Sequence, residues 1–117
     1  MTPQEIAAMI SSVGVPYAYS HFDATPEHPA PAPPFICFFF PGSDDVYADN
    51  KNYVSIADLS VELYTRNKDY ALESAVEAAL AAHDLAWDKE QTYLDGEKVY
   101  MTSWDCSTVL KGGNNAQ

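Results

Sequence analysis

The sequence predicts an α+β fold in which two α-helices pack on an antiparallel β-sheet, in the order α-β-β-β-α-β-β. Two segments carry apolar residues at helical spacing, and other segments are apolar or alternate polar with apolar residues, as strands do. The chain has 117 residues, which is enough for one hydrophobic core. We therefore expect a single domain over residues 1–110 and a disordered tail over residues 111–117.

The first helix is expected over residues 2–13. Thr2 and Glu5 have the spacing of a capping box, in which each side chain binds the backbone N–H of the other residue. Gly14 can adopt the left-handed conformation that ends a helix. Apolar residues recur at the interval that places them on one helical face, namely Ile6, Met9, Ile10 and Val13.

The next segments differ sharply in proline content. Residues 15–22 are short and aromatic and can form a strand. Residues 23–34 are predicted to be an exposed loop or arm, because prolines this dense cannot donate to a helix or a sheet. Residues 35–40 are an uninterrupted apolar run, which is typical of a strand covered on both faces.

A long strand is predicted over residues 53–65. It follows a turn region through Asp45, the segment Val46-Tyr47-Ala48 and a polar hairpin tip at residues 49–52. In the second half of this strand polar and apolar residues alternate, so one face should be buried and the other wet. The apolar positions are Ala57, Leu59, Val61 and Leu63, and the polar ones are Asp58, Ser60, Glu62 and Tyr64.

The second helix is expected over residues 70–83. Glu73 and Glu77 should project away from its apolar face. His83, in the last turn, is expected to be half-buried near the negative end of the helix dipole. The residues that share the apolar face are Leu72, Val76, Ala79, Leu80 and His83.

The last predicted element is a hairpin. Its strands cover residues 87–94 and 98–110. Asp95-Gly96 between them is a strong signal for a tight turn. The hairpin completes the predicted sheet.

The charge balance limits the possible partners. The chain has 17 acidic and 6 basic residues, which gives a net charge of −11. Such a surface repels nucleic acid and anionic membranes, so we expect DNA only as passing cargo and no membrane partner. No signal peptide and no run of about 20 apolar residues is apparent, which favours a soluble protein that starts in the cytoplasm.

No catalytic or cofactor-binding set is apparent. Cys37 follows His21 and Asp23 in the sequence, but it stands within an apolar strand, where burial raises a thiol's pKa and reduces its reactivity. Cys106 lies on a mixed strand, and the two cysteines lack the spacing of metal ligands. We expect both thiols to be inert, and the protein not to be an enzyme.

No metal site is expected either. His21, Asp23 and His28 lie in or beside the proline-rich segment, which is a poor template for fixed metal geometry. A second acidic group lacks the alternating ligands, central glycine and closing glutamate of an EF-hand loop, so polar turn residues explain it as well as a weakly bound ion does. This group comprises Asp44, Asp45 and Asp49.

Aromatic residues are numerous, with eight Tyr, five Phe and two Trp. Such side chains are favoured at protein–protein contacts, although a core with ordinary hairpin faces is the alternative interpretation. The candidate subunit-interface residues are Phe35, Phe38, Phe40, Tyr47, Tyr53, Tyr64 and Trp104.

The order of these features resembles small proteins from the tail-assembly region of tailed bacteriophages and prophages. The resemblance is to tail completion or tail terminator proteins, and it covers most of the chain. The long proline-rich stretch departs from the expected pattern. The matching features are the proline-rich approach to residues 35–40, Phe40-Pro41-Gly42-Ser43-Asp44, Tyr47-Ala48-Asp49, Val61-Glu62-Leu63-Tyr64-Thr65 before an acidic helix, and the hairpin around Asp95-Gly96.

This resemblance implies a structural virion protein without catalytic residues. Such proteins have a sheet with two helices and form rings, typically hexamers, that cap the tail tube and join it to the head connector. Implied partners are copies of the chain, the tail tube and the head connector, with assembly in the host cytoplasm and a final place in the virion tail or neck. The alternatives are an acidic binding module or DNA mimic that inhibits a nucleic-acid-binding host protein, and a small enzyme whose site comes from distant residues.

Overall fold

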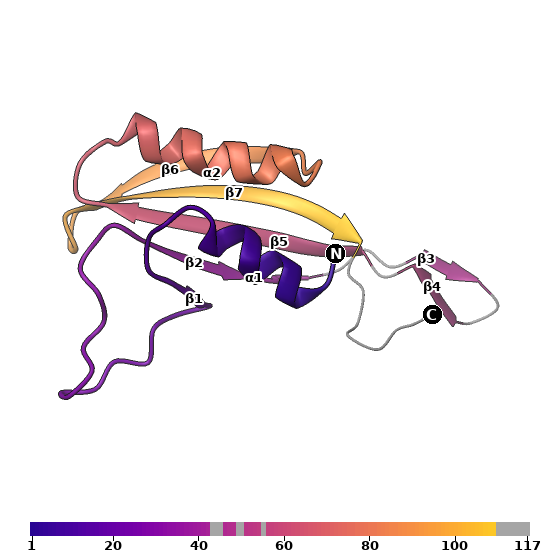
Figure 1. Cartoon of the computed structure of the whole chain (residues 1–117), viewed down its shortest axis with the longest axis horizontal. Helices are drawn as coiled ribbons and strands as arrows, with labels where there is room; N and C mark the ends of the chain where they lie inside the picture. Colours follow the sequence, from indigo (N-terminus) through magenta and orange to yellow (C-terminus); the bar gives the residue numbers. More distant parts are fainter. Residues whose placement is uncertain (43–45, 49–50, 55, 110–117) are drawn as a thin grey trace.

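The computed structural model describes the chain except residues 43–45, 49–50, 55 and 110–117, and it describes side chains outside residues 43–57 and 109–117. The described elements form one larger sheet, a separate strand pair and two helices (Figure 1). In chain order they are α1 (Pro3–Ser11), β1 (Tyr17–Tyr19), β2 (Phe35–Phe39), β3 (Val46–Ala48), β4 (Lys51–Val54), β5 (Ile56–Thr65), α2 (Tyr70–Ala82), β6 (Trp87–Leu94) and β7 (Val99–Val109).

The larger sheet has the strand order β1-β2-β5-β7-β6. All of its neighbouring strands are antiparallel except β1 and β2, which are parallel. The α+β class and the element order are therefore confirmed, but the sheet is mixed rather than wholly antiparallel. The reason is the long proline-rich loop, since two parallel strands need a long connection that carries the chain back to the end where the first strand began.

The predicted long strand is divided between two sheets. β4 pairs with β3 in a two-stranded antiparallel sheet, whereas β5 pairs with β2 and β7 in the larger one. Lys51 and Asn52, predicted as part of a hairpin tip, belong to β4. The rest of that predicted tip, residues 49–50, lies outside the described residues.

α1 begins at its predicted capping box and ends at Ser11, two residues before the predicted end at residue 13. The Thr2 hydroxyl accepts a hydrogen bond from the Glu5 backbone N–H at 3.1 Å, and Glu5 Oε1 accepts one from the Thr2 backbone N–H at 2.7 Å. Gly14 has a φ of 93°, in the left-handed region that favours glycine. The capping box and the glycine stop are thus confirmed.

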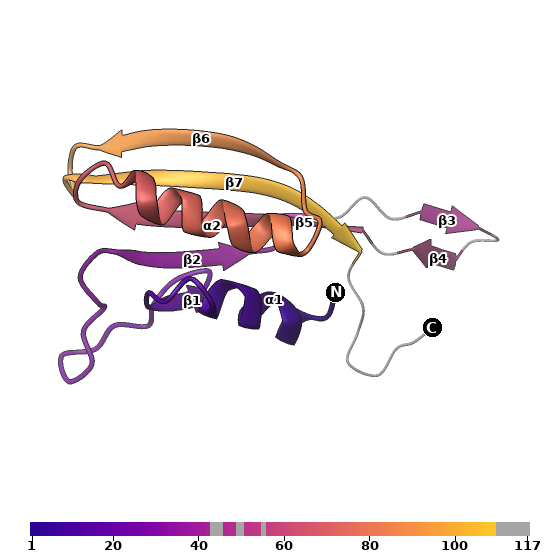
Figure 2. The same cartoon turned by 45° about the horizontal axis from the view of Figure 1, so that its top comes forward.

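The hydrophobic core lies between the two helices and one face of the larger sheet (Figures 1 and 2). β2 is fully covered on one face only: Ile36 and Phe38 point into the core, whereas Phe35 and Phe39, on the other face, are half-buried. The cover on both faces that its apolar run predicts is therefore incomplete within the chain. The core residues are Ile6, Met9 and Ile10 of α1, Val76 and Leu80 of α2, Leu85, and the strand residues Ile36, Phe38, Leu59, Val61, Leu63, Trp104 and Cys106.

Three side chains of the second helix differ from the prediction. Glu77, expected to project away, turns inward and accepts a hydrogen bond from the core residue Trp104. Glu73 is buried, only 3% exposed, although the apolar pattern placed it outside. His83 caps the C-terminus of α2 and is exposed rather than half-buried. The helix ends at Ala82 and the chain turns through a positive φ at Asp84, so His83 no longer follows the buried face.

Candidate functional site

One face of the larger sheet is not covered by either helix, and we call it the open face. Successive residues of a strand point to opposite faces, so the side chains that alternate with the core residues form this surface. The open face comprises Phe35, Cys37 and Phe39 of β2, Asp58, Ser60, Glu62 and Tyr64 of β5, Met101, Ser103 and Asp105 of β7, and Asp88, Glu90 and Thr92 of β6.

Several side chains of the open face are less exposed to solvent than side chains on the solvent-facing side of a sheet usually are. Cys37, Ser60 and Ser103 are each less than 9% exposed, because larger neighbours such as Tyr64 and Phe39 stand beside these small side chains. Tyr64 and Phe39 are themselves half-buried. The prediction that one face of β5 is wet is therefore only partly correct.

An aromatic group occupies one end of the open face. The rings of Phe35 and Tyr64 are stacked, with centroids 4.9 Å apart and an angle of 26° between their planes. Phe22, from the proline-rich side, meets Phe35 edge-on at 5.3 Å. Aromatic pairs in these geometries contribute more than their buried area alone. The aromatic end is thus an apolar platform of packed rings, which we call the aromatic platform.

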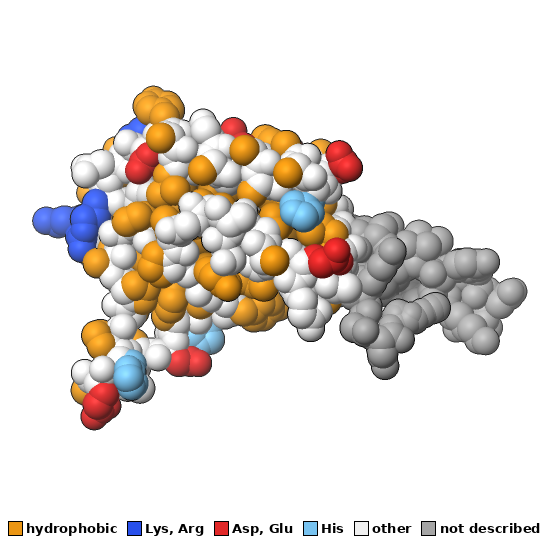
Figure 3. Space-filling view, in the orientation of Figure 1, with side chains coloured by type: hydrophobic (Ala, Val, Ile, Leu, Met, Phe, Trp, Pro, Cys, Tyr) orange, Lys and Arg blue, Asp and Glu red, His pale blue; other side chains and the backbone are white. Residues whose placement is uncertain are grey.

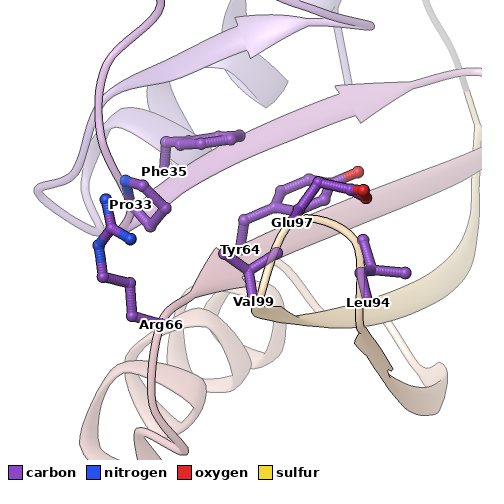
Figure 4. Close-up of a pocket in the computed structure, with 7 residues that line it drawn as sticks. All are labelled: Pro33, Phe35, Tyr64, Arg66, Leu94, Glu97 and Val99. Atoms are coloured by element: carbon purple, nitrogen blue, oxygen red, sulfur yellow. The ribbon is translucent and has the colours of Figure 1, made fainter.

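A cavity of about 450 Å³ lies over this aromatic platform. Figure 4 shows Arg66 beside Pro33 on the side of the cavity opposite to Leu94. Burial, followed by the hydrogen bond that the Tyr64 hydroxyl donates to Glu62 at 2.9 Å, raises the pKa of Tyr64 well above its usual value. Tyr64 therefore stays protonated at neutral pH and cannot act as a base. The lining residues are Pro33, Phe35, Tyr64, Arg66, Leu94, Glu97 and Val99.

Carboxylates occupy the rest of the open face. Asp88 of β6 stands directly opposite Asp105 of β7 in the strand register. Like charges in directly opposed positions destabilise a sheet. Lys89, between Asp88 and Glu90, points to the other face, where it binds acidic residues of α2. The carboxylates of the open face therefore do not stabilise the fold, and a role in binding is the alternative reason for their presence.

A partly buried ion-pair network lies on the other face, between α2, β6 and the segment before α2. Glu73 Oε2 is 2.9 Å from Lys68 Nζ, and Glu73 Oε1 is 3.0 Å from Lys89 Nζ. Gln91 Nε2 donates to Glu73 Oε2 at 3.0 Å. Burial raises the pKa of Glu73, but the hydrogen bonds from Lys68, Lys89 and Gln91 outweigh it, so the pKa lies below its ordinary value.

Glu77 extends the same network to the core tryptophan. Lys89 Nζ is 2.8 Å from Glu77 Oε2, and Trp104 Nε1 donates to the same oxygen at 3.1 Å. These bonds, with that from Lys89 first, lower the pKa of Glu77. Because both carboxylates are ionised and bound by several donors, this network is suited to holding α2 on the sheet, not to proton transfer.

The cysteines are buried, as predicted. Burial raises the pKa of the Cys37 thiol and raises that of Cys106 to about 11. A thiol that is protonated at neutral pH is a poor nucleophile. No disulfide joins the two residues.

The residues considered as metal ligands, and not expected to form a site, fall into two groups. His21 Nε2 and Asp23 Oδ1 are 3.1 Å apart on exposed side chains, and His28 is exposed in the same loop. Within the described residues, no cluster of three or more His, Cys, Asp or Glu could hold a metal ion. The aspartate group, Asp44, Asp45 and Asp49, lies outside those residues.

The structure brings together only some of the predicted interface residues. Phe35 and Tyr64 meet on the open face, and Phe40, just after β2, is partly buried against the core. Phe38 and Trp104 were wrong choices, because they are 6% and 0% exposed within the core of the same chain. The two remaining candidates, Tyr47 of β3 and Tyr53 of β4, have side chains outside the described part.

Sequence reasoning missed two features of the site. Glu73 lies three residues before Val76 and seven before Leu80, the spacing of the buried stripe, so its burial could have been found. The pairing of Asp88 with Asp105 depends on the register of the closing hairpin, which Asp95-Gly96 indicates but does not fix alone.

Comparisons with known proteins give no further guide. No family model matches the chain, and no curated protein matches it. Among the described residues, no helix is both long enough and apolar enough to cross a membrane.

Proposed function

We propose that the chain is a self-assembling structural protein of a phage tail, which completes or caps the tail tube and joins it to the head connector as a subunit of a ring. The open face is the observation that carries this proposal. A sheet face that is uncovered, half-buried in part and carries an apolar aromatic platform at one end is suited to packing against another protein. The resemblance to tail completion proteins supplies the particular assembly and its place in the virion.

The chemistry of the described residues supports a structural role. The buried thiols are protonated, Tyr64 is protonated, and the carboxylates of α2 are held in ion pairs. The net charge of −11 per chain suits a ring through which DNA passes, because a negative channel offers the phosphates no counterion-releasing contact.

Self-assembly is tested by the mass of the purified protein in solution, measured by light scattering over a concentration series. We expect species larger than one chain that grow with concentration. The variant Phe35→Ala, on the open face, should weaken association, whereas His28→Ala, an exposed residue of the proline-rich loop, should not. Circular dichroism checks that both variants fold. A wild-type chain that stays monomeric throughout contradicts the proposal.

The acidic part of the open face favours a second candidate function. An acidic binding module that mimics DNA would present carboxylates on one surface, as Asp58, Asp88 and Asp105 do around one shallow hollow. Such a module should compete with DNA for a nucleic-acid-binding protein. A panel of nucleases and repressors, assayed with and without the chain, tests this function, and no inhibition across the panel excludes it for those proteins.

A further inference from the structure

The outward surface of α2 carries no charge. The helix contains two acidic residues, Glu73 and Glu77, and both turn inward to Lys89. Figure 3, which views the side of the molecule that bears the helices, shows apolar and neutral groups over the helices and charged groups mainly near the margins. The exposed side chains of α2 are Tyr70, Ala71, Ser74, Ala78, Ala81 and Ala82.

The two sides of the molecule therefore differ in charge. The open face presents Asp58, Glu62, Asp88, Glu90 and Asp105. The basic side chain of Arg66 lies at its aromatic end, beside the cavity. Two open faces packed on each other would bring ten carboxylates together, and such like-charge contacts oppose association. The neutral helical side can approach the open face without that repulsion.

We propose that the helical side of one copy, centred on α2, packs on the open face of the next copy. This inference rests on the proposed self-assembly and adds which two surfaces meet. The alanines and the serine on α2 let a helix lie close to a sheet, and the aromatic platform of Phe35 and Tyr64 supplies apolar area beneath it. Each sheet would then be covered by helices on both faces, as sheets in larger proteins are.

The size and symmetry of this contact suit a ring. The strands of the larger sheet offer roughly 600 Å² from strand spacing and rise, near the roughly 800 Å² per partner of stable interfaces. The two surfaces are different, so each copy can bind one neighbour on each side. Contacts of this head-to-tail kind close into a ring when the rotation between copies permits.

Opposite charges placed at Ala78 test the contact. Ala78 is exposed at the middle of α2, and both Glu and Lys are good helix formers, so Ala78→Glu and Ala78→Lys should fold alike. Ala78→Glu should weaken association about tenfold or more, because it sets a carboxylate against the acidic open face. Ala78→Lys should leave association unchanged or strengthen it. The matched controls Ala30→Glu and Ala30→Lys, in the exposed proline-rich loop, should match the wild type.

A second variant reverses the charge on the partner surface. Ala78→Glu combined with Glu62→Lys and Glu90→Lys should regain most of the lost association, again measured by light scattering. If wild-type chains associate but both Ala78 variants behave like the wild type, or both lose association equally, the assigned contact is wrong while self-assembly stands. If wild-type chains do not associate at all, self-assembly itself fails.

Discussion

At the residue scale, Glu73 shows how a charged side chain can take a core position. Its carboxylate lies under α2, where an unpaired charge would be very costly. Lys68 and Lys89 reach it from two different segments, and their side chains remain about one-third exposed. The lysine stems therefore cover apolar surface while their ammonium groups bind the buried oxygens. Position 73 consequently belongs to the core, although its residue type indicates the surface.

Glu73→Ala should lower the free energy of unfolding by about 2 kcal/mol, below the 3–5 kcal/mol of a fully buried pair because both lysines reach solvent. The loss leaves Gln91 and the two ammonium groups without their common acceptor. Chemical denaturation measures the change. Glu90→Ala, an exposed glutamate on β6, is the control and should change the unfolding free energy by less than about 0.5 kcal/mol. Equal effects of the two variants would contradict the burial of Glu73.

The pH dependence of stability follows from the same carboxylate. The pKa of Glu73 is lower in the folded chain than the ordinary value of about 4.3. Its contribution is therefore fully present above that value and is lost as the pH falls through the folded pKa. Urea unfolding at several acidic pH values should show a smaller loss of stability for Glu73→Gln than for the wild type. If the unfolding free energies of the two proteins fall in parallel as the pH is lowered, Glu73 is not the source of the acid-induced loss of stability.

The buried thiols give a prediction that needs no substitution. Cys37 and Cys106 should react with a thiol reagent on the order of 100-fold more slowly in the native chain than in denaturant, because reaction requires local opening. The absorbance of the released chromophore gives both rates. A fast native reaction of even one thiol would argue against the described packing of β2 or β7.

At the scale of elements, the hairpin of β6 and β7 places two aspartates directly opposite each other on the open face. Asp88 and Asp105 are cross-strand neighbours, and no described lysine or arginine lies between them. Elsewhere the hairpin is favourable, with Tyr93 against Tyr100 at 4.9 Å and Lys89 bound to α2. The repulsion is therefore local, and a single substitution can remove it.

Asp88→Asn should raise the free energy of unfolding by about 0.2–1 kcal/mol at low salt, as expected for relief of one opposed like-charge pair. Thermal unfolding at low and at high salt measures the gain, which should shrink as salt screens the wild-type repulsion. Asp95→Asn, in the turn of the same hairpin, makes the same chemical change away from Asp105. A drop in stability for Asp88→Asn would show that the aspartate pair has a favourable partner.

At the scale of the whole molecule, local signals predicted most of the fold. The capping box of α1, the proline-rich break and the position of β2 depend on neighbouring residues, and these predictions were correct, although β2 is fully covered on one face only. The parallel pairing of β1 with β2, the division of the long strand and the burial of Glu73 depend on contacts between distant segments. For the candidate site, the sequence indicated Phe35 and Tyr64 but could not tell them from Phe38 and Trp104, which point to the core.

Association of the whole chain should depend on salt. Copies with a net charge of −11 repel one another, and salt screens that repulsion. Larger species should therefore appear at lower protein concentration in about 0.5 M salt than in about 0.05 M salt, where the Debye length is longer. Light scattering at both salt concentrations measures the shift. Weaker association at high salt would show that ion pairs dominate the contact.

The ion-pair network under α2 also constrains how the sequence can change over evolutionary time. Loss of the carboxylate at position 73 leaves Lys68 without its ion pair and Lys89 with Glu77 alone. Loss of one lysine leaves the buried carboxylate with a single ammonium partner. Single substitutions therefore pass through a less stable intermediate. In homologous chains we expect residues 68, 73 and 89 to vary together, with all three polar or all three replaced by apolar residues.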